Sequence, residues 1–285
     1  MPRPCWSRLN PFAPRDPEVA VVRLKGPIGD LGSFRQGLNI ERFDGVLKAA
    51  FASRRTTAVA LVINSPGGSP VQSDLIKTRI EALSREHEKP VTAFTEDLCA
   101  SGGYWIAQAA DEIIAHPSSV VGSIGVITAG FGLQEAIGKL GIERRVHTKG
   151  AAKGMLDPFQ AEKPEEVARL EALQQDLYEG FKEVVRRRRG TKLKGEEDEL
   201  FSGAVWTGTK ALELGIVDGL GDLRTVMRER YGEDVRFRRY GPRLSFWQKL
   251  RRGNVAAENA EGAPSLMHGL IAAVEERLLW NRFGL

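Results

Sequence analysis

The sequence predicts an α/β layered fold built from repeated strand–helix units. A continuous apolar run at residues 58–63 is typical of a strand buried on both faces of a sheet. Apolar residues at helical spacing before and after that run, at 40–52 and 69–83, indicate amphipathic helices. The chain has 285 residues, 42% of them hydrophobic, which is enough for a substantial core.

The first half of the chain alternates between the two kinds of element. A β-rich run at 19–24 ends at Gly26 and Pro27, a pair that favours a turn. After it, the pattern predicts a helix at 40–52, a strand at 58–63, a helix at 69–83, a strand at 91–94 and a helix at 102–110. This alternation is what an α/β layered fold requires.

The second half continues with shorter β segments, predicted at 113–115, 120–127 and 144–147. The strongest helix prediction is 164–188, where one apolar stripe is formed by Val167, Leu170, Leu173, Leu177, Phe181 and Val184. Residues 203–222 follow as a compact strand–turn–helix piece.

Changes in composition divide the chain into three parts. Residues 1–17 are rich in proline and are interpreted as an extended arm, and residues 18–232 as the main domain. Residues 233–285 are interpreted as a basic linker followed by a C-terminal amphipathic helix at 265–285. The apolar stripe of that helix is expected to pack on the core or on a partner subunit, with contact to a membrane surface as the alternative.

Composition excludes several classes of protein. Cys5 and Cys99 make neither a disulfide framework nor a metal site, so no metal and no cofactor is predicted. No segment approaches the roughly 18 apolar residues of a membrane-spanning helix, and residues 1–15 lack the apolar core of a signal peptide. We therefore expect a cytoplasmic protein. The net charge of +4 includes basic runs at 186–189 and 236–252, but no nucleic-acid-binding motif accompanies them.

Three features together point to acyl-transfer chemistry. Ser101 lies in a glycine-containing turn, where it is either a nucleophile or a helix N-cap. Gly67 and Gly68 follow a predicted strand, and such a glycine pair can offer backbone N–H groups to an oxyanion. Lys153 lies among small and apolar residues that would shield it from water, as a lysine acting as a base requires.

A histidine base is less well supported. His87 and His116 lie in a charged stretch and a predicted turn, and for His268 too a surface or structural role is favoured. His147 stays a candidate, because it lies on the segment leading to Lys153. Lys149 is the nearest competitor of Lys153 as the base.

The chain resembles the signal peptide peptidase A family. The resemblance rests on the motifs Asn-Ser-Pro-Gly-Gly at 64–68, Ala-Ser-Gly-Gly-Tyr at 100–104, Gly-Ser-Ile-Gly-Val at 122–126 and Lys-Gly-Ala-Ala-Lys at 149–153, with a closing motif at 208–218. It covers roughly residues 18–230.

The resemblance implies a fold of the Clp-protease/crotonase type and a serine endopeptidase that acts through an acyl-enzyme. Ser101 would be the nucleophile and Lys153 the general base. Gly68 and Gly102 would form the oxyanion hole, and Ser123 would orient the lysine. The substrates implied are small apolar or signal-peptide-like peptides. The resemblance also implies a homo-oligomer whose active sites form between subunits.

Three alternative hypotheses about the function stay open on the sequence alone. Related Ser–Lys peptidases act in the maturation of phage capsids. Acyl-CoA enzymes of the crotonase type share the fold and the oxyanion-binding amides. A non-catalytic scaffold of the same fold is the third.

Overall fold

The computed structural model describes residues 16–30, 37–150, 152–242, 280 and 283. In this part the elements are β1 (Glu18–Lys25), α1 (Ile40–Ala52), β2 (Thr56–Ser65), α2 (Pro70–His87), β3 (Val91–Ala100), α3 (Gly102–Ala107), β4 (Glu112–Ala115), β5 (Val120–Gly122), α4 (Gln134–Lys139), α5 (Pro164–Arg189), the 3-10 turn η2 (Gly190–Lys192), α6 (Glu197–Leu200), β6 (Val205–Thr207), α7 (Gly208–Glu213), β7 (Gly219–Leu220), α8 (Leu223–Tyr231) and β8 (Arg236–Tyr240).

The strands form one sheet in the order β6-β5-β3-β2-β1-β8, with β4 and β7 continuing it beside the first half of β3. The pairs are parallel except for β5 with β6. β3 changes neighbour along its length, since residues 92–95 pair with β4 and residues 98–100 with β5. In β2 residues 58–65 are buried, as the continuous apolar run predicts. The predicted α/β layered fold is therefore confirmed.

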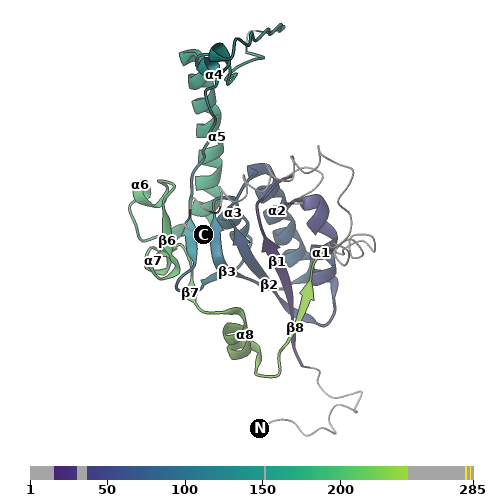
Figure 1. Ribbon diagram of the computed structural model, residues 1–285. Coiled ribbons are helices and arrows are strands. Elements are labelled where there is room, and N and C mark those ends of the chain that lie inside the picture. The colour runs from purple at the N-terminus through teal and green to yellow at the C-terminus, as the bar shows by residue number, and fades with distance from the viewer. Residues whose placement is uncertain (1–15, 31–36, 151, 243–279, 281–282, 284–285) are drawn as a thin grey trace.

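The two faces of the sheet are covered unequally (Figure 1). On one face, α1, α2, α3 and the end of α5 bury a large core with side chains such as Leu47, Ile76 and Ile106. On the other face, a smaller cluster that includes Val19 and Ala60 packs against Met227 of α8. α8 covers only part of this second face, which leaves a hollow beside it.

The starts of two helices hold the loops around the sheet in place. Asn39 caps α1 by accepting a hydrogen bond from the Arg42 amide at 2.9 Å. Ser69 caps α2 by accepting from the Gln72 amide, and Pro70 follows at the first helical position. Because Ser69 comes directly after Gly67 and Gly68, this cap also fixes where the turn formed by the two glycines ends.

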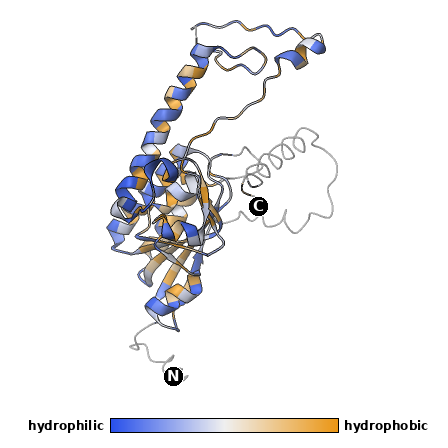
Figure 2. Cartoon of the chain, turned by 90° about the vertical axis from the view of Figure 1, so that its left-hand side faces the viewer, coloured by the Kyte–Doolittle hydropathy of each residue, from blue (hydrophilic) through white to orange (hydrophobic). Residues whose placement is uncertain are grey.

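α5 projects from the body as an arm, and α4 lies level with its far end but set off to one side (Figure 2). Near its C-terminal end Phe181, Val184 and Val185 are buried, whereas Leu173 and Leu177 of the same predicted stripe are exposed. The sequence therefore predicts the helix correctly, but only the end of its apolar stripe packs on the protomer's own core.

The strand predicted at 144–147 is wrong, and the one predicted at 120–127 ends at Gly122. In the structure residues 144–147 are irregular and exposed, with Val146 lying on the surface. A strand needs a neighbour to satisfy its backbone groups, and none of the described residues pairs with this segment. The β propensity of these residues therefore does not produce a strand here.

The sheet also continues past residue 232, where the sequence places the end of the main domain. Residues 236–240 form β8, which pairs in parallel with β1 from Glu18 to Val22. Of the predicted helix at 265–285, only residues 280 and 283 are described. Residues 1–15 of the predicted N-terminal arm, a different segment from the arm formed by α5, also fall outside the described residues. None of the helices in the described ranges is both long and apolar enough to cross a bilayer.

The base of α5 is tied to the sheet by a partly buried ionic cluster around Asp218. This carboxylate accepts hydrogen bonds from Arg189 at 2.6 Å, from Lys192 at 2.8 Å and from the Ile113 amide at 2.9 Å. Arg189 also donates two hydrogen bonds to the Gly215 carbonyl. Burial opposes ionisation of Asp218, but the hydrogen bonds from Arg189, Lys192 and the amide outweigh it and lower its pKa.

Replacing this carboxylate is expected to loosen the arm's attachment. Asp218→Asn leaves the Arg189 guanidinium, only 2% exposed, without its counter-ion, and should cost roughly 3–5 kcal/mol of unfolding free energy. Because the folded-state pKa is below the ordinary 3.8, the wild-type contribution is present above about pH 4 and is lost as the pH falls further. Urea unfolding at pH 7 and at pH 3 measures both effects, and an unchanged midpoint at pH 7 would contradict the prediction.

Candidate active site

Ser101 occupies a sharp turn between a strand and a helix. β3 ends at Ala100 and α3 begins at Gly102, and Ser101 between them has φ 52° and ψ −123°. A positive φ is uncommon for a residue with a Cβ, and such strain persists only where the surroundings impose it. Here the Ser101 amide donates to the Gly122 carbonyl at 2.8 Å, and its carbonyl accepts from the Trp105 amide at 2.9 Å. The backbone of the turn is thus held on both sides.

The hydroxyl of Ser101 is not used as a helix cap. Ser101 stands at the N-cap position of α3, but its side chain makes no capping hydrogen bond. Of the two roles that the sequence leaves open for Ser101, the structure therefore removes the capping one. Ser101 is partly exposed, and its hydroxyl makes no hydrogen bond with any described residue.

Both glycines of the pair lie so close to neighbouring groups that a side chain is excluded. A Cβ on Gly67 would lie 2.7 Å from the Ser101 Cβ, and one on Gly68 would lie 2.1 Å from the Ile28 carbonyl oxygen. Both glycines have positive φ, at 100° and 142°. These positions therefore require glycine for conformation as well as for space.

Two backbone amide nitrogens, those of Gly68 and Gly102, lie close to the turn at Ser101. The Gly68 nitrogen lies 3.4 Å from the position that a Cβ of Gly102 would occupy. In the described parts of the chain, neither the Gly68 amide nor the Gly102 amide donates a hydrogen bond to the backbone or to a side chain. Two free N–H groups next to a free hydroxyl are the arrangement that an oxyanion hole needs.

Ser123 also lies near this turn. It directly follows Gly122, whose carbonyl accepts the Ser101 amide, and it has φ 55°. Its own amide donates to the Ala204 carbonyl at 2.7 Å, which fixes it against the loop before β6. The structure therefore brings together Ser101, Gly68, Gly102 and Ser123.

Lys153 is not beside Ser101 in the protomer. It lies between α4 and α5, in a segment tied to the start of α5 by a 2.8 Å hydrogen bond from the Leu156 amide to Glu166. The rings of Phe181 and Trp105 stack at 4.7 Å near Ser101, and the stretch of α5 from Glu166 to Phe181 is roughly 22 Å long. Lys153 is also exposed, so the protomer alone does not shield it from water as the sequence suggests.

The alternative bases are equally remote or engaged elsewhere. Lys149 and His147 are exposed on the same arm as Lys153. His116 accepts a hydrogen bond from the Ser118 amide and lines the hollow on the other face of the sheet. His87 lies at the end of α2, 3.9 Å from Glu86, and His268 is outside the described residues. In the described ranges, no three His, Cys, Asp or Glu side chains are grouped to hold a metal ion.

Cys99, two residues before Ser101, does not compete as a nucleophile. Its side chain is buried, and burial raises the pKa of its thiol far above neutrality. The thiol is therefore protonated and out of reach, and the reactive form of a cysteine is the thiolate. Of these two side chains, only that of Ser101 is accessible.

Ser65 is a positioning residue that sequence reasoning missed. Its hydroxyl donates to the Gly26 carbonyl at 2.7 Å and accepts from the Gly67 amide at 3.2 Å. It therefore links the end of β1 to the glycine turn that faces Ser101. The signal is its place inside the Asn-Ser-Pro-Gly-Gly motif, but only the structure shows which groups its hydroxyl joins.

Comparison with known proteins identifies the family of this chain. The profile described as peptidase family S49 matches residues 84–233. The Serine protease SPPA, chloroplastic, of Arabidopsis thaliana is 33% identical over 205 residues, which cover 72% of this chain and 29% of that protein. A solved structure of the membrane-bound stomatin-specific protease 1510-N with a substrate peptide is 17% identical, with a TM-score of 0.49, and the match covers 83% of this chain and 96% of that one.

A third relative carries a different name. A Brucella abortus protein named Na(+)/H(+) antiporter NhaA is 47% identical over 285 residues, which are 98% of this chain but 39% of that protein. The chain thus spans well under half the length of these two curated relatives. Most of the Brucella protein lies outside the match.

The close approach of Gly68 to the Ile28 carbonyl can be tested by adding one methyl group at Gly68. Gly68→Ala should lower the free energy of unfolding by roughly 1–3 kcal/mol, because the new Cβ collides with the Ile28 carbonyl at an unfavourable φ. Gly45→Ala is the matched control, since Gly45 lies inside α1 with nothing near its Cβ position and alanine should stabilise the helix. Chemical denaturation measures both, and equal stability of the two variants would refute the steric argument.

Proposed function

Because this chain belongs to peptidase family S49, we propose that it is a serine endopeptidase in which Ser101 is the nucleophile and Lys153 the general base. The observation that carries the proposal is the free hydroxyl of Ser101, on a strained turn beside the two free amides of Gly68 and Gly102. A Ser–Lys pair needs no metal and no cofactor for peptide hydrolysis.

The proposed reaction has two halves. Lys153, in its neutral form, takes the Ser101 proton as the oxygen attacks the scissile carbonyl, and the amides of Gly68 and Gly102 stabilise the resulting oxyanion. The proton then passes to the leaving amine, which departs and leaves an acyl-enzyme. A water molecule, deprotonated by Lys153, hydrolyses the ester and restores the Ser101 hydroxyl. In this scheme the Ser123 hydroxyl orients the lysine without adding charge.

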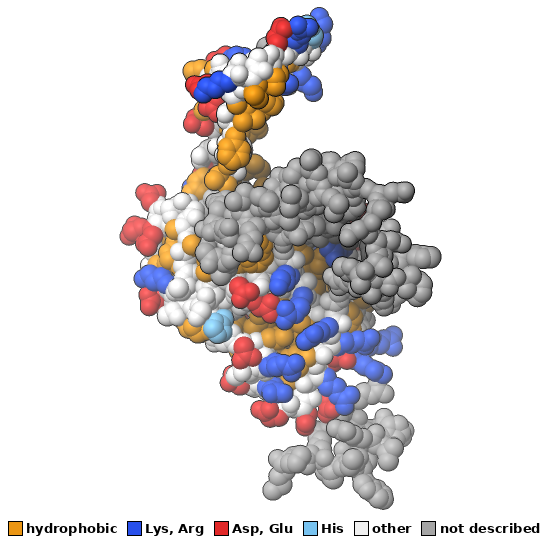
Figure 3. Space-filling model, in the orientation of Figure 1, with side chains coloured by type: hydrophobic (Ala, Val, Ile, Leu, Met, Phe, Trp, Pro, Cys, Tyr) orange, Lys and Arg blue, Asp and Glu red, His pale blue; other side chains and the backbone are white. Residues whose placement is uncertain are grey.

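We propose that the two catalytic residues of each site come from neighbouring copies in a homo-oligomer. The length of α5 keeps Lys153 away from Ser101 of its own chain, as described above. The arm also exposes large apolar side chains, with Phe131 82%, Leu140 73% and Leu173 56% exposed. Figure 3 shows hydrophobic side chains along the arm. Exposed apolar surface of this kind marks a protein interface, and burial there would also shield Lys153 from water.

The proposed substrates are small apolar or signal-peptide-like peptides. Support comes from α2, which begins two residues after the glycine pair and exposes Val71 at 63% and Leu75 at 44%. These side chains offer apolar contact to a peptide lying along the glycine turn. The acyl-CoA alternative would use the same two amides but would leave the free hydroxyl of Ser101 without a role.

Substitution at the two catalytic positions is the first test. Ser101→Ala should lower cleavage of a fluorogenic peptide library by about a thousandfold or more, since no other group supplies the nucleophile. Lys153→Ala should cost roughly a hundredfold to ten-thousandfold, whereas Lys149→Ala should be tolerated. Loss of activity in Lys149→Ala with an active Lys153→Ala would show that the base is misassigned. Equal cleavage by Ser101→Ala and the wild type would remove Ser101 as the nucleophile.

Mixing inactive variants tests whether sites form between copies. Ser101→Ala and Lys153→Ala, dissociated and reassembled together in equal amounts, should recover activity at about a quarter of the sites, because random neighbours then include intact pairs. The control is the double variant Ser101→Ala/Lys153→Ala mixed with Lys153→Ala, in which no intact pair can arise. If the first mixture stays as inactive as this control, the pairing between copies is refuted.

A further inference from the structure

The strand that leads to Ser101, β3, is interrupted by a bulge shortly before it ends. Residue 63 of β2 is aligned with residue 95 of β3, and residue 65 with residue 99, so one residue of β2 faces three of β3. On its other side, β3 pairs with β4 up to residue 95 and with β5 from residue 98. Glu96 and Asp97 therefore form a bulge that pairs with neither β4 nor β5.

The bulge lies where β3 changes its neighbour. The other residues of β3 are buried, whereas Glu96 is partly exposed and Asp97 is exposed. Both line the hollow of about 680 Å³ that lies beside α8. A bulge bends its strand and increases the local twist. The bend lets the end of β3 leave β4 and run along β5, and Ser101 follows directly after this redirected part.

Asn64, the residue opposite the bulge, holds it from the side of β2. Asn64 is 2% exposed, and its amide group donates a hydrogen bond to the Asp97 carboxylate at 2.7 Å. The Asn64 carbonyl accepts from the Gly26 amide at 2.9 Å, which attaches the same residue to the end of β1. A buried donor that loses its acceptor is costly, so this bond resists any displacement of the bulge.

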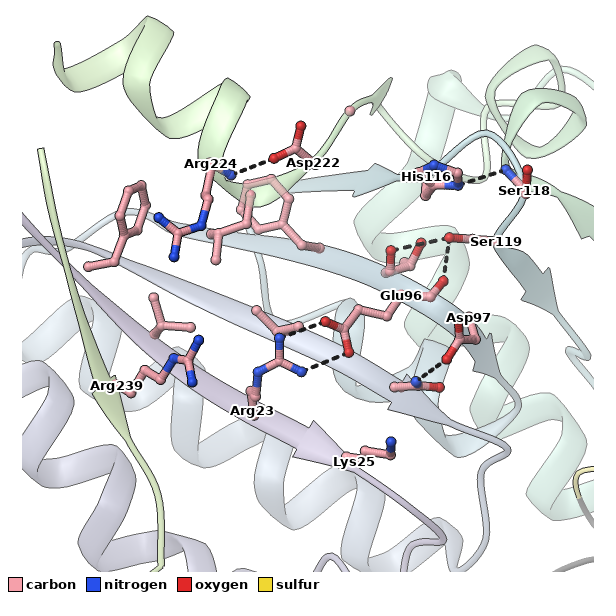
Figure 4. A pocket seen from close by; sticks show the side chains of 18 residues that line it. Arg23, Lys25, Glu96, Asp97, His116, Ser118, Ser119, Asp222, Arg224 and Arg239 are labelled. Atoms are coloured by element: carbon pink, nitrogen blue, oxygen red, sulfur yellow. Dashed lines mark hydrogen bonds and ion pairs between the residues drawn. The ribbon is translucent and has the colours of Figure 1, made fainter. Parts of the chain in front are cut away.

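Ser119 holds the bulge from the side of β5. Ser119 is 1% exposed and directly precedes β5. Its hydroxyl donates to the Thr95 carbonyl at 3.2 Å and to the Glu96 carbonyl, at the start of the bulge. Figure 4 shows Ser119 on one side of Glu96, and Arg23, which pairs with the Glu96 carboxylate, on the other. The bulge is therefore attached to strands on both of its sides.

The far end of β5 is the end that holds Ser101. Residues 98–100 of β3 pair with residues 120–122 of β5, and the Gly122 carbonyl then accepts from the Ser101 amide at 2.8 Å. β5 is thus attached to β3 by Ser119 before its first residue and by Gly122 at its last. A strand rises by about 3.3 Å per residue, so a shift of this register by one residue would take the Gly122 carbonyl away from the Ser101 amide.

We propose that Ser119 and the Asn64–Asp97 pair are positioning residues for Ser101. They hold the bulge, and the bulge sets the direction and the register in which β3 reaches the turn. The inference rests on the proposed function, because Ser101 is the nucleophile there, and it adds residues that act on Ser101 only through the backbone. A displacement of about 1 Å at a reacting group can slow a reaction by about a hundredfold.

Removing either attachment should slow the reaction without weakening substrate binding. Asp97→Ala deprives the Asn64 amide group of its acceptor, and Ser119→Ala removes the donor to the two carbonyls. Each should lower kcat for one fluorogenic peptide by roughly tenfold to a hundredfold and leave KM within about twofold. Asp97→Asn keeps an oxygen that can accept from Asn64, so this variant should retain the wild-type kcat.

Amide hydrogen exchange supplies a readout that needs no activity. Measured by mass spectrometry, the segment 98–104 should exchange about tenfold faster or more in both alanine variants, and at the wild-type rate in Asp97→Asn. Asp222→Ala is the matched control, since Asp222 is exposed, lines the same hollow and accepts from neutral groups, but at the start of α8. This variant should weaken α8 and keep the wild-type kcat and the wild-type exchange of 98–104.

The outcomes separate this inference from the proposed function. Wild-type kcat and exchange in both alanine variants would overturn it, as would equal losses in Asp97→Asn or in Asp222→Ala. If the wild type cleaves no peptide, the proposed function fails. Faster exchange of 98–104 in the two alanine variants alone would then still support the role of Ser119 and the Asn64–Asp97 pair in placing the turn at Ser101.

Discussion

The packing of the last turns of α5 on the body of the protein determines where the two halves of the proposed site lie. Phe181 stacks on Trp105, and Arg189 pairs with Asp218, so the C-terminal end of the helix is fixed close to Ser101. A helix is stiff and rises by about 1.5 Å per residue. Its other end, with the segment that holds Lys153, must therefore lie far from the turn that holds Ser101.

The proposed site consequently has two parts of different origin. The nucleophile and the oxyanion-binding amides are assembled locally, by the ends of β2 and β3 and the turn after β5. Their geometry depends on short contacts that exclude side chains at Gly67 and Gly68. The base comes from a distant segment, so its position relative to Ser101 depends on assembly. One chain thus holds every proposed group and yet does not complete the site.

The surface of the segment around α4 and α5 reflects the same incompleteness. The arm exposes apolar side chains that a single protomer cannot bury. Exposed apolar surface of this kind gives affinity for a partner that covers it.

By itself the sequence determined the layered fold, the order of most elements and the motifs of the candidate site, because buried strands, amphipathic helices and glycine turns leave local patterns. Local patterns also predicted a strand at 144–147 and an end of the main domain at 232. The strand prediction failed, since a strand exists only where a neighbour pairs with it: residues 144–147 have none among the described residues, whereas residues 236–240 pair with β1. Only the tertiary structure decided that Ser101 and Lys153 lie apart, because distance through space follows from how α5 packs.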